Sequence, residues 1–141
     1  MDDLDENLLA RLRDNARVPV AELARGLGLS RTTVQSRLAR LERSGVIAGY
    51  ALRMASSYEA ARLQAHVMLT LEPKQATAVS VALKRLPGVR RLQSVSGSFD
   101  MIATLEAANV SEMDGLIEAI GALKGVERTN ASIVLATKFD R

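Results

Sequence analysis

The sequence predicts an α+β protein in two parts: a winged helix-turn-helix over residues 1–52 and a ferredoxin-like βαββαβ domain over residues 64–141, joined by a linker over 53–63. Apolar side chains recur at helical spacing in three runs of the first part. Strand-like and helix-like patterns alternate in the second part. There, Leu86-Pro87-Gly88-Val89 and Leu123-Lys124-Gly125-Val126 nearly repeat each other, as two successive strand-helix-strand units would.

Three helices are expected in the first part. The first has leucines at helical spacing between residues 4 and 12, after an acidic start that suits the helix dipole. The second covers residues 20–27 and ends at Gly28, because glycine tolerates a left-handed turn. Ser30 can cap the third helix, which would bury Val34, Leu38 and Leu41. A short strand-like stretch over 46–52 would form the wing.

The second part is expected to contain four strands and two helices. The strands are predicted over 65–71, from Val89 to about 96, over 101–107 and from Val126 to 136. Ser111 is the expected cap of the second helix. The helices cover one face of such a sheet, and the other face carries side chains such as His66, Met68 and Thr70, which are not strongly polar. We therefore expect this face to pack against a second copy of the chain, in a dimer at least.

The second and third predicted helices have the close spacing of a helix-turn-helix, whose second helix enters the major groove of double-stranded DNA. Between Arg25 and Arg53 the charged residues are six arginines and Glu42, which suits a phosphate-binding surface. Gln and Arg can pair with base edges, whereas Arg37 and Arg40 flank the reading face and are expected to hold phosphates. The predicted DNA-binding residues are Ser30, Arg31, Thr32, Thr33, Gln35, Ser36, Arg37 and Arg40. The alternative is a helical bundle with a polar outer face.

Composition argues against an enzyme and against a metal or cofactor site. The sequence has no Cys and a single His, His66, which falls inside a predicted strand. We find no metal-ligand spacing, no phosphate-binding glycine loop and no candidate catalytic residue. The acidic start lacks the features of a secretory signal, and no apolar run reaches the roughly 20 residues that span a bilayer. We expect a cytoplasmic protein, associated with the nucleoid and not with a membrane.

The residues that carry these patterns resemble the Lrp/AsnC, or feast/famine, family of transcription regulators. The matching residues in the first part are Leu4-Asp5, Leu8-Leu9, Leu12, Asp14 to Arg17, Glu22-Leu23-Ala24, Gly28-Leu29-Ser30, Val34, Arg37-Leu38, Arg40-Leu41-Glu42 and Gly45-Val46-Ile47. Those in the second part are Pro87-Gly88-Val89, Ser96 to Asp100, Gly125-Val126, Thr129 and Ile133-Val134. The resemblance covers nearly the whole chain.

The resemblance implies a dimer that associates further, commonly into an octamer, and an amino acid or related metabolite bound between C-terminal domains. It assigns the effector to the loop Gly97, Ser98, Phe99 and Asp100 and to Thr129. Asp100 could accept hydrogen bonds from an α-ammonium group, and the amides of Gly97 and Ser98 could hold a carboxylate. Ala131 stands where many relatives have a second Thr. Taken alone, the loop is also compatible with a plain hairpin turn.

Two other functions use the same helices. An architectural, effector-independent protein would bend DNA with little sequence preference, and would show a small ratio of specific to non-specific affinity with a steep salt dependence. A ligand-sensing or interaction module whose helical part binds protein would show no salt-dependent binding to any duplex.

Overall fold

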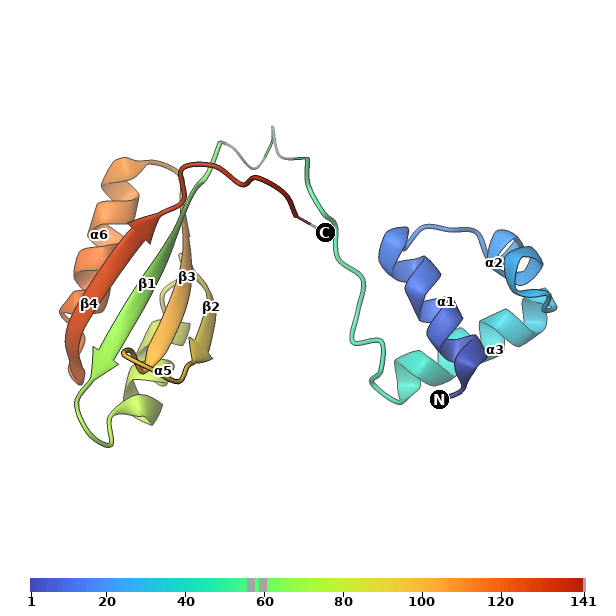
Figure 1. Cartoon of the computed structure of the whole chain (residues 1–141), viewed down its shortest axis with the longest axis horizontal. Helices are drawn as coiled ribbons and strands as arrows, with labels where there is room; N and C mark the ends of the chain where they lie inside the picture. The colour runs from blue at the N-terminus through green and yellow to red at the C-terminus, as the bar shows by residue number, and fades with distance from the viewer. Residues whose placement is uncertain (56–57, 59–60, 141) are drawn as a thin grey trace. The chain divides into compact units, whose positions relative to one another are not determined.

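The computed structural model describes residues 1–55, 58 and 61–140, and the chain divides into two compact units, Met1–Arg53 and Met54–Arg141 (Figure 1). Each unit has its own hydrophobic core. The predicted linker over 53–63 includes residues 56, 57, 59 and 60, which lie outside the described residues. No helix among the described residues is long and apolar enough to cross a membrane.

The first unit consists of three helices, as predicted: α1 (Asp3–Asp14), α2 (Val20–Leu27) and α3 (Arg31–Arg43). Their apolar faces meet in a small core of aliphatic side chains formed by Leu8, Leu23, Ala24, Val34 and Leu41. No aromatic side chain is part of this core, so each aliphatic contact contributes a large share of the buried area. The helical periodicity in the sequence therefore identified the buried faces correctly.

The turn between α2 and α3 is short because both of its ends are capped. Gly28 adopts a left-handed conformation (φ +66°) at the end of α2, and its N–H bonds to the carbonyl oxygen of Ala24. Ser30 begins α3, and its hydroxyl accepts a hydrogen bond from the N–H of Thr33 (3.1 Å). Both caps were predicted from the sequence and are confirmed.

The strand predicted over residues 46–52 is not formed. After α3 the chain turns back on the helix end, where the N–H of Ile47 donates to the carbonyl oxygen of Leu41 (3.0 Å). The rest of the segment is irregular, and Leu52 is exposed. The first unit contains no strand anywhere in Met1–Arg53, so an extended segment has no ladder partner there and gains nothing from strand geometry. The helix-turn-helix is thus present without a strand in the wing position.

The second unit is the predicted βαββαβ fold. Its elements are β1 (Leu63–Leu71), α5 (Ala76–Lys84), β2 (Val89–Ser94), β3 (Met101–Ala107), α6 (Val110–Gly121) and β4 (Val126–Ile133). The sheet has the order β2-β3-β1-β4, and all of its pairings are antiparallel (Figure 1). The second and fourth strands end earlier than predicted. Asn109, and not Ser111, caps α6 by accepting the N–H of Glu112 (2.9 Å).

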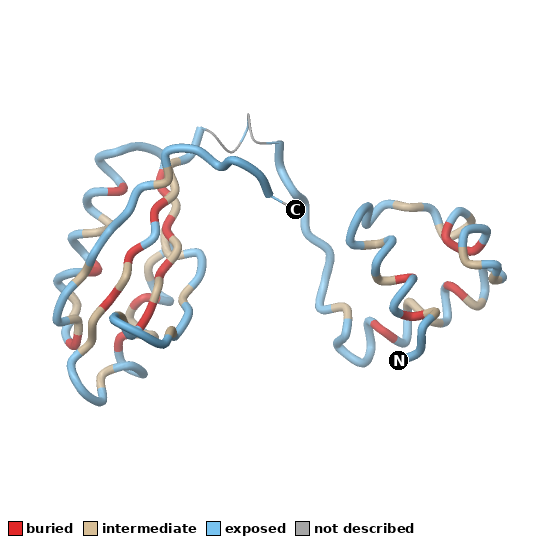
Figure 2. Tube along the Cα trace, in the orientation of Figure 1, coloured by how far each residue is buried: buried red, intermediate tan, exposed pale blue. Residues whose placement is uncertain are grey.

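The two faces of the sheet differ in burial. Alternate residues of β1 and β3 point to the helices and are buried, among them Val67, Leu69 and Leu105, and they pack with Val79 of α5 and Ile120 of α6. The intervening residues form the open face: His66, Met68 and Thr70 on β1, and Ile102, Thr104 and Glu106 on β3. Figure 2 shows this alternation along the strands. Both helices of this unit pack against the other face, although Oγ1 of Thr70 on the open face is buried and has no hydrogen-bond partner among the described residues.

Candidate functional site

The outer face of α3 exposes the polar side chains that the sequence assigned to base reading. Arg31, Thr32, Gln35 and Ser36 are all exposed, whereas Val34 and Leu41 on the opposite side are buried. Arg31 and Gln35 lie one helical turn apart, so their side chains project from the same strip of surface. This strip combines a guanidinium, a carboxamide and two hydroxyls, which together offer donors and acceptors of the kinds that read base edges.

The two remaining predicted residues at the start of α3 serve the helix cap. The hydroxyl oxygens of Ser30 and Thr33 are 2.7 Å apart, and that of Ser30 also accepts the N–H of Thr33. These contacts satisfy the N-terminal turn of the helix and fix where it begins. Ser30 and Thr33 therefore set the start of the strip, and their hydroxyls already have protein partners.

Arg37 and Arg40 both bind carboxylates of α1. The Nη1 of Arg37 lies 2.8 Å from both oxygens of Asp2 and 2.8 Å from Oδ1 of Asp5. The Nη2 of Arg40 lies 2.6 Å from Oδ2 of Asp5. The side chain of Arg37 is only 19% exposed and that of Arg40 is 55% exposed. All of these contacts of Arg37 use Nη1, and little of its side chain is exposed to reach a phosphate, whereas Arg40 retains open surface.

Asp5 is completely buried, and sequence reasoning assigned it only a helix-dipole role. The hydrogen bond from Arg37 is the main reason that its pKa lies below the usual value, with smaller contributions from the backbone N–H of Asp2 and the charge of Arg40. The hydrogen bond from Arg37 likewise lowers the pKa of Asp2 to about 2. Both carboxyls are thus charged at neutral pH. The contacts cross more than thirty residues of chain, so local spacing carried no signal of them.

The loop before β3 is held to the end of β1 by Asp100. Its N–H donates to the carbonyl oxygen of Leu69 (2.9 Å), and its Oδ2 accepts the N–H of Leu71 (2.7 Å). Val95 closes the loop by donating its N–H to the carbonyl oxygen of Asp100 (3.1 Å). The carboxylate predicted to receive an ammonium group therefore already binds a backbone N–H, which occupies one of its two oxygens.

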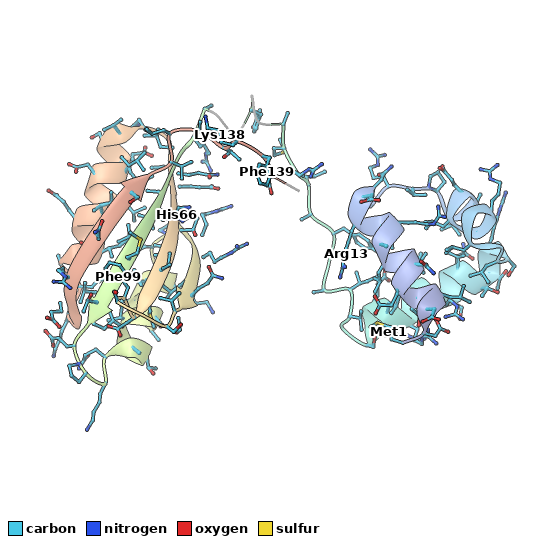
Figure 3. The ribbon with its side chains drawn as sticks, viewed as in Figure 1. Met1, Arg13, His66, Phe99, Lys138 and Phe139 are labelled. Carbon is cyan, nitrogen blue, oxygen red and sulfur yellow. The ribbon has the colours of Figure 1, made fainter. Side chains whose placement is uncertain are left out.

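The structure brings the loop and Thr129 to the same end of the sheet. Thr129 pairs with Leu69 across β1 and β4, and the N–H of Asp100 binds that same Leu69. Phe99, labelled in Figure 3, lies in this loop and is half-buried. Among the described residues, the N–H groups of Gly97 and Ser98 donate to no other protein group. Asp100 and Thr129 thus both adjoin Leu69, while the hydroxyl of Thr129 lies toward Gly121 of α6, on the side of the sheet that the helices cover.

A separate apolar groove of about 420 Å³ lies beside α6 and β4. Its lining residues are Val110, Ser111, Met113, Asp114, Ile117 and Ile133. None of these is a predicted effector residue. Among the described residues there is also no group of three or more His, Asp and Glu side chains that could hold a metal ion.

Comparison with known proteins decides the family. Residues 1–42 match the AsnC-type helix-turn-helix domain, and residues 64–141 match the Lrp/AsnC ligand-binding domain. The chain belongs to the Lrp/AsnC family. The family consists of transcription regulators and is not a family of enzymes, and the resemblance drawn from the sequence is confirmed. The protein is a DNA-binding transcription regulator of the Lrp/AsnC type.

Relatives cover nearly the whole chain. The HTH-type transcriptional regulator LrpA of Mycobacterium tuberculosis is 33% identical over 99% of this chain and 93% of its own length, and its crystal structure superposes with a TM-score of 0.82. LysM of Sulfurisphaera tokodaii is 30% identical over 99% of this chain and 98% of its own length. The structure of a Neisseria meningitidis regulator in complex with L-Met has the same fold (TM-score 0.89, 22% identity, covering 99% of this chain and 93% of that one).

Proposed function

We propose that this Lrp/AsnC regulator reads DNA sequence with the exposed strip of α3 and that an amino acid or related metabolite, bound at the loop 97–100, modulates it. The observation that carries the DNA part is the exposure of Arg31, Thr32, Gln35 and Ser36 on one strip of a helix whose start is fixed by the cap at Ser30. In a helix-turn-helix, residues near the start of the second helix reach base edges in the major groove.

The test is salt-dependent binding to the duplex upstream of the protein's own coding region, with random duplex of equal length as competitor. Arg31→Ala is expected to reduce the slope of log K against log salt by about 1 if its guanidinium neutralises one phosphate, or to relax base preference if it reads a base. Arg85→Ala, which removes one exposed arginine from the second unit, is the matched control. Absence of salt-sensitive binding to any duplex would refute the proposal.

The effector part rests on the grouping of Asp100, the loop amides and Thr129 at one end of β1. The free N–H groups of Gly97 and Ser98 suit an α-carboxylate, and the second oxygen of Asp100 suits an α-ammonium. The L-Met complex of the Neisseria meningitidis regulator supports an amino acid as the ligand class. Ala131 offers no hydroxyl, so we propose that polar contacts come from the loop and from Thr129.

A panel of amino acids, screened by calorimetry and by its effect on DNA affinity, tests this part. Asp100→Asn is the informative variant, because its carboxamide oxygen can still accept the N–H of Leu71 while the charge is lost. Binding of the effector should fall at least tenfold with the fold intact. Unchanged binding would exclude Asp100 as the ammonium partner.

The open face of the sheet supports a dimer that associates into a larger assembly, with an octamer as the proposed final state. Met68 and Ile102 pair across β1 and β3 at the middle of this face, and Glu106, near the end of β3, forms an ion pair with Arg90 (3.3 Å). Sedimentation of the full chain and of Met68→Glu tests this, since a buried charge should dissociate the assembly. We also propose that the protein acts in the cytoplasm at the nucleoid, where its DNA lies.

An architectural role remains the second candidate function, because several helix-turn-helix units on one assembly would bend DNA. It predicts similar affinity for the upstream duplex and for random duplex, and no effect of any amino acid.

A further inference from the structure

We propose that Asp2 and Asp5 are positioning residues for sequence reading: by holding Arg37 and Arg40, they fix the orientation of α3 and thereby decide which bases its exposed strip meets. The inference rests on the proposed binding of DNA by α3. In this inference the main role of Arg37 and Arg40 is to align α3, and contact with phosphates is secondary.

The contacts attach α3 to α1 at two points. Asp5 binds Arg37 through Oδ1 (2.8 Å) and Arg40 through Oδ2 (2.6 Å), and these arginines lie almost one turn apart on α3. Two directional contacts to one carboxylate resist both sliding of the helix along its axis and rolling about it. A third contact fixes the carboxylate itself, because the N–H of Asp2 donates a hydrogen bond to Oδ2 of Asp5 (3.1 Å).

The apolar core gives less directional control. The core of the first unit, to which α1 contributes Leu8 and α3 contributes Val34 and Leu41, consists of aliphatic side chains without an aromatic ring. Hydrophobic burial is non-directional, and aliphatic cores tolerate small repacking at modest cost. A helix that rolled slightly would keep most of its buried area but would move the strip containing Gln35 relative to the base edges.

Asp2 extends the attachment to the end of α1. Its carboxylate accepts the N–H of Asp5 (2.9 Å) and so caps α1, and both of its oxygens lie 2.8 Å from Nη1 of Arg37. The side chain of Asp2 is 54% exposed, whereas Asp5 is buried. Asp5 is therefore the main attachment, and Asp2 strengthens the contact to Arg37.

If Asp2 and Asp5 acted only through their charge, removing them should strengthen DNA binding, which is the opposite of what a positioning role predicts. A carboxylate near DNA repels phosphates, so its loss should strengthen binding to every duplex alike. A positioning role instead predicts that binding to the selected duplex weakens while binding to random duplex is unchanged or slightly stronger. The ratio of the two affinities therefore separates the explanations.

The experiment uses the full chain with Asp5→Asn, Asp2→Ser and the control Asp3→Asn. Asp3 lies in the same first turn of α1, is exposed and contacts neither arginine among the described residues. Asp2→Ser retains a cap for α1 but loses the ion pair, so it tests the idea in a chain that folds even if Asp5→Asn does not. Binding to the selected and random duplexes is measured well below the unfolding temperature of each variant.

We expect Asp5→Asn to lower the ratio of selected to random affinity by about tenfold or more, Asp2→Ser to lower it less, and Asp3→Asn to leave it unchanged. Arg37→Gln should also reduce the ratio in the wild-type background, and should reduce it less in the Asp5→Asn background, because one of the two carboxylate partners of Arg37 is already lost there. If Asp2→Ser, Asp3→Asn and the wild type all gave the same ratio of selected to random affinity, the inference would be overturned but the proposed function would stand. A wild type that binds no duplex would overturn the proposed function and the inference with it.

Discussion

Gly125 offers the sharpest test of packing in the ligand-binding unit. It precedes β4 with φ +96°, a region that residues with a side chain rarely adopt. A Cβ added there would lie 2.7 Å from Cβ of Gln75 and 3.0 Å from Cγ2 of Val79. Val79 is fully buried and cannot move away without disturbing the core. Gly125→Ala thus combines backbone strain with overpacking.

The expected cost follows from the two terms. Backbone strain at such a φ costs about 1–3 kcal/mol, and overpacking costs about 1–3 kcal/mol more. The total, about 2–6 kcal/mol, is a large part of the roughly 4–13 kcal/mol that stabilises a unit of this size. Gly115→Ala is the matched control: Gly115 lies inside α6 with nothing within 4 Å of an added Cβ, so the same change should stabilise by about 0.5–1 kcal/mol.

Hydrogen exchange read by mass spectrometry on the full chain separates the two units. Gly125→Ala should accelerate exchange in β1 and β4 and leave α1 and α3 unaffected, whereas Gly115→Ala should slow exchange in the second unit. If both variants changed exchange in the same direction and by similar amounts, the reasoning from φ and contact distance would be refuted.

Three further predictions concern the proposed sites. Gln35→Ala should cost about 1–3 kcal/mol at the selected duplex and relax preference at one base, as base-by-base substitution of that duplex would reveal; an even loss across all sequences would contradict base reading. The first unit should lose stability as the pH falls from about 5 towards 2. The folded-state pKa of Asp2 (about 2) and that of Asp5 lie below the usual 3.8, so their contribution is complete above that value and disappears on protonation. Acid titration followed by circular dichroism checks this, and the loss should be shallower in Arg37→Gln. Asp100→Ala, unlike Asp100→Asn, should also speed exchange of the Leu71 amide, because it removes the acceptor of that N–H.

Much of the fold could be predicted from the sequence because its periodicities are strong. Alternation along 101–107 identified β3 at its observed ends, and the apolar spacing of Val34 and Leu41 identified the buried side of α3. Helix ends were predictable where one capping residue stood alone, as at Ser30. At α6 the prediction of Ser111 was wrong, because the helix begins two residues earlier and Asn109 caps it.

The contacts of the candidate site were harder to predict. Arg37 looked like a free phosphate ligand because its two partners lie far away in sequence and are common surface residues. Asp100 had the expected chemistry, but its bond to Leu71 depends on the path of the loop over β1, which composition does not encode. The strand over 46–52 failed because strand formation needs a partner, and single-segment patterning contains no information about partners.

The buried carboxylate of Asp5 also constrains how this regulator can evolve. Replacing one arginine leaves the buried carboxylate with incomplete compensation, and replacing Asp5 alone leaves Arg40 without its carboxylate and Arg37 with Asp2 only, so each single change should cost more stability than the combined change. Lineages that abandon this arrangement should therefore have changed both helices together. Among relatives that bind other operators, Gln35 and its exposed neighbours should vary freely, whereas Asp5, Arg37 and Arg40 should be kept or changed together.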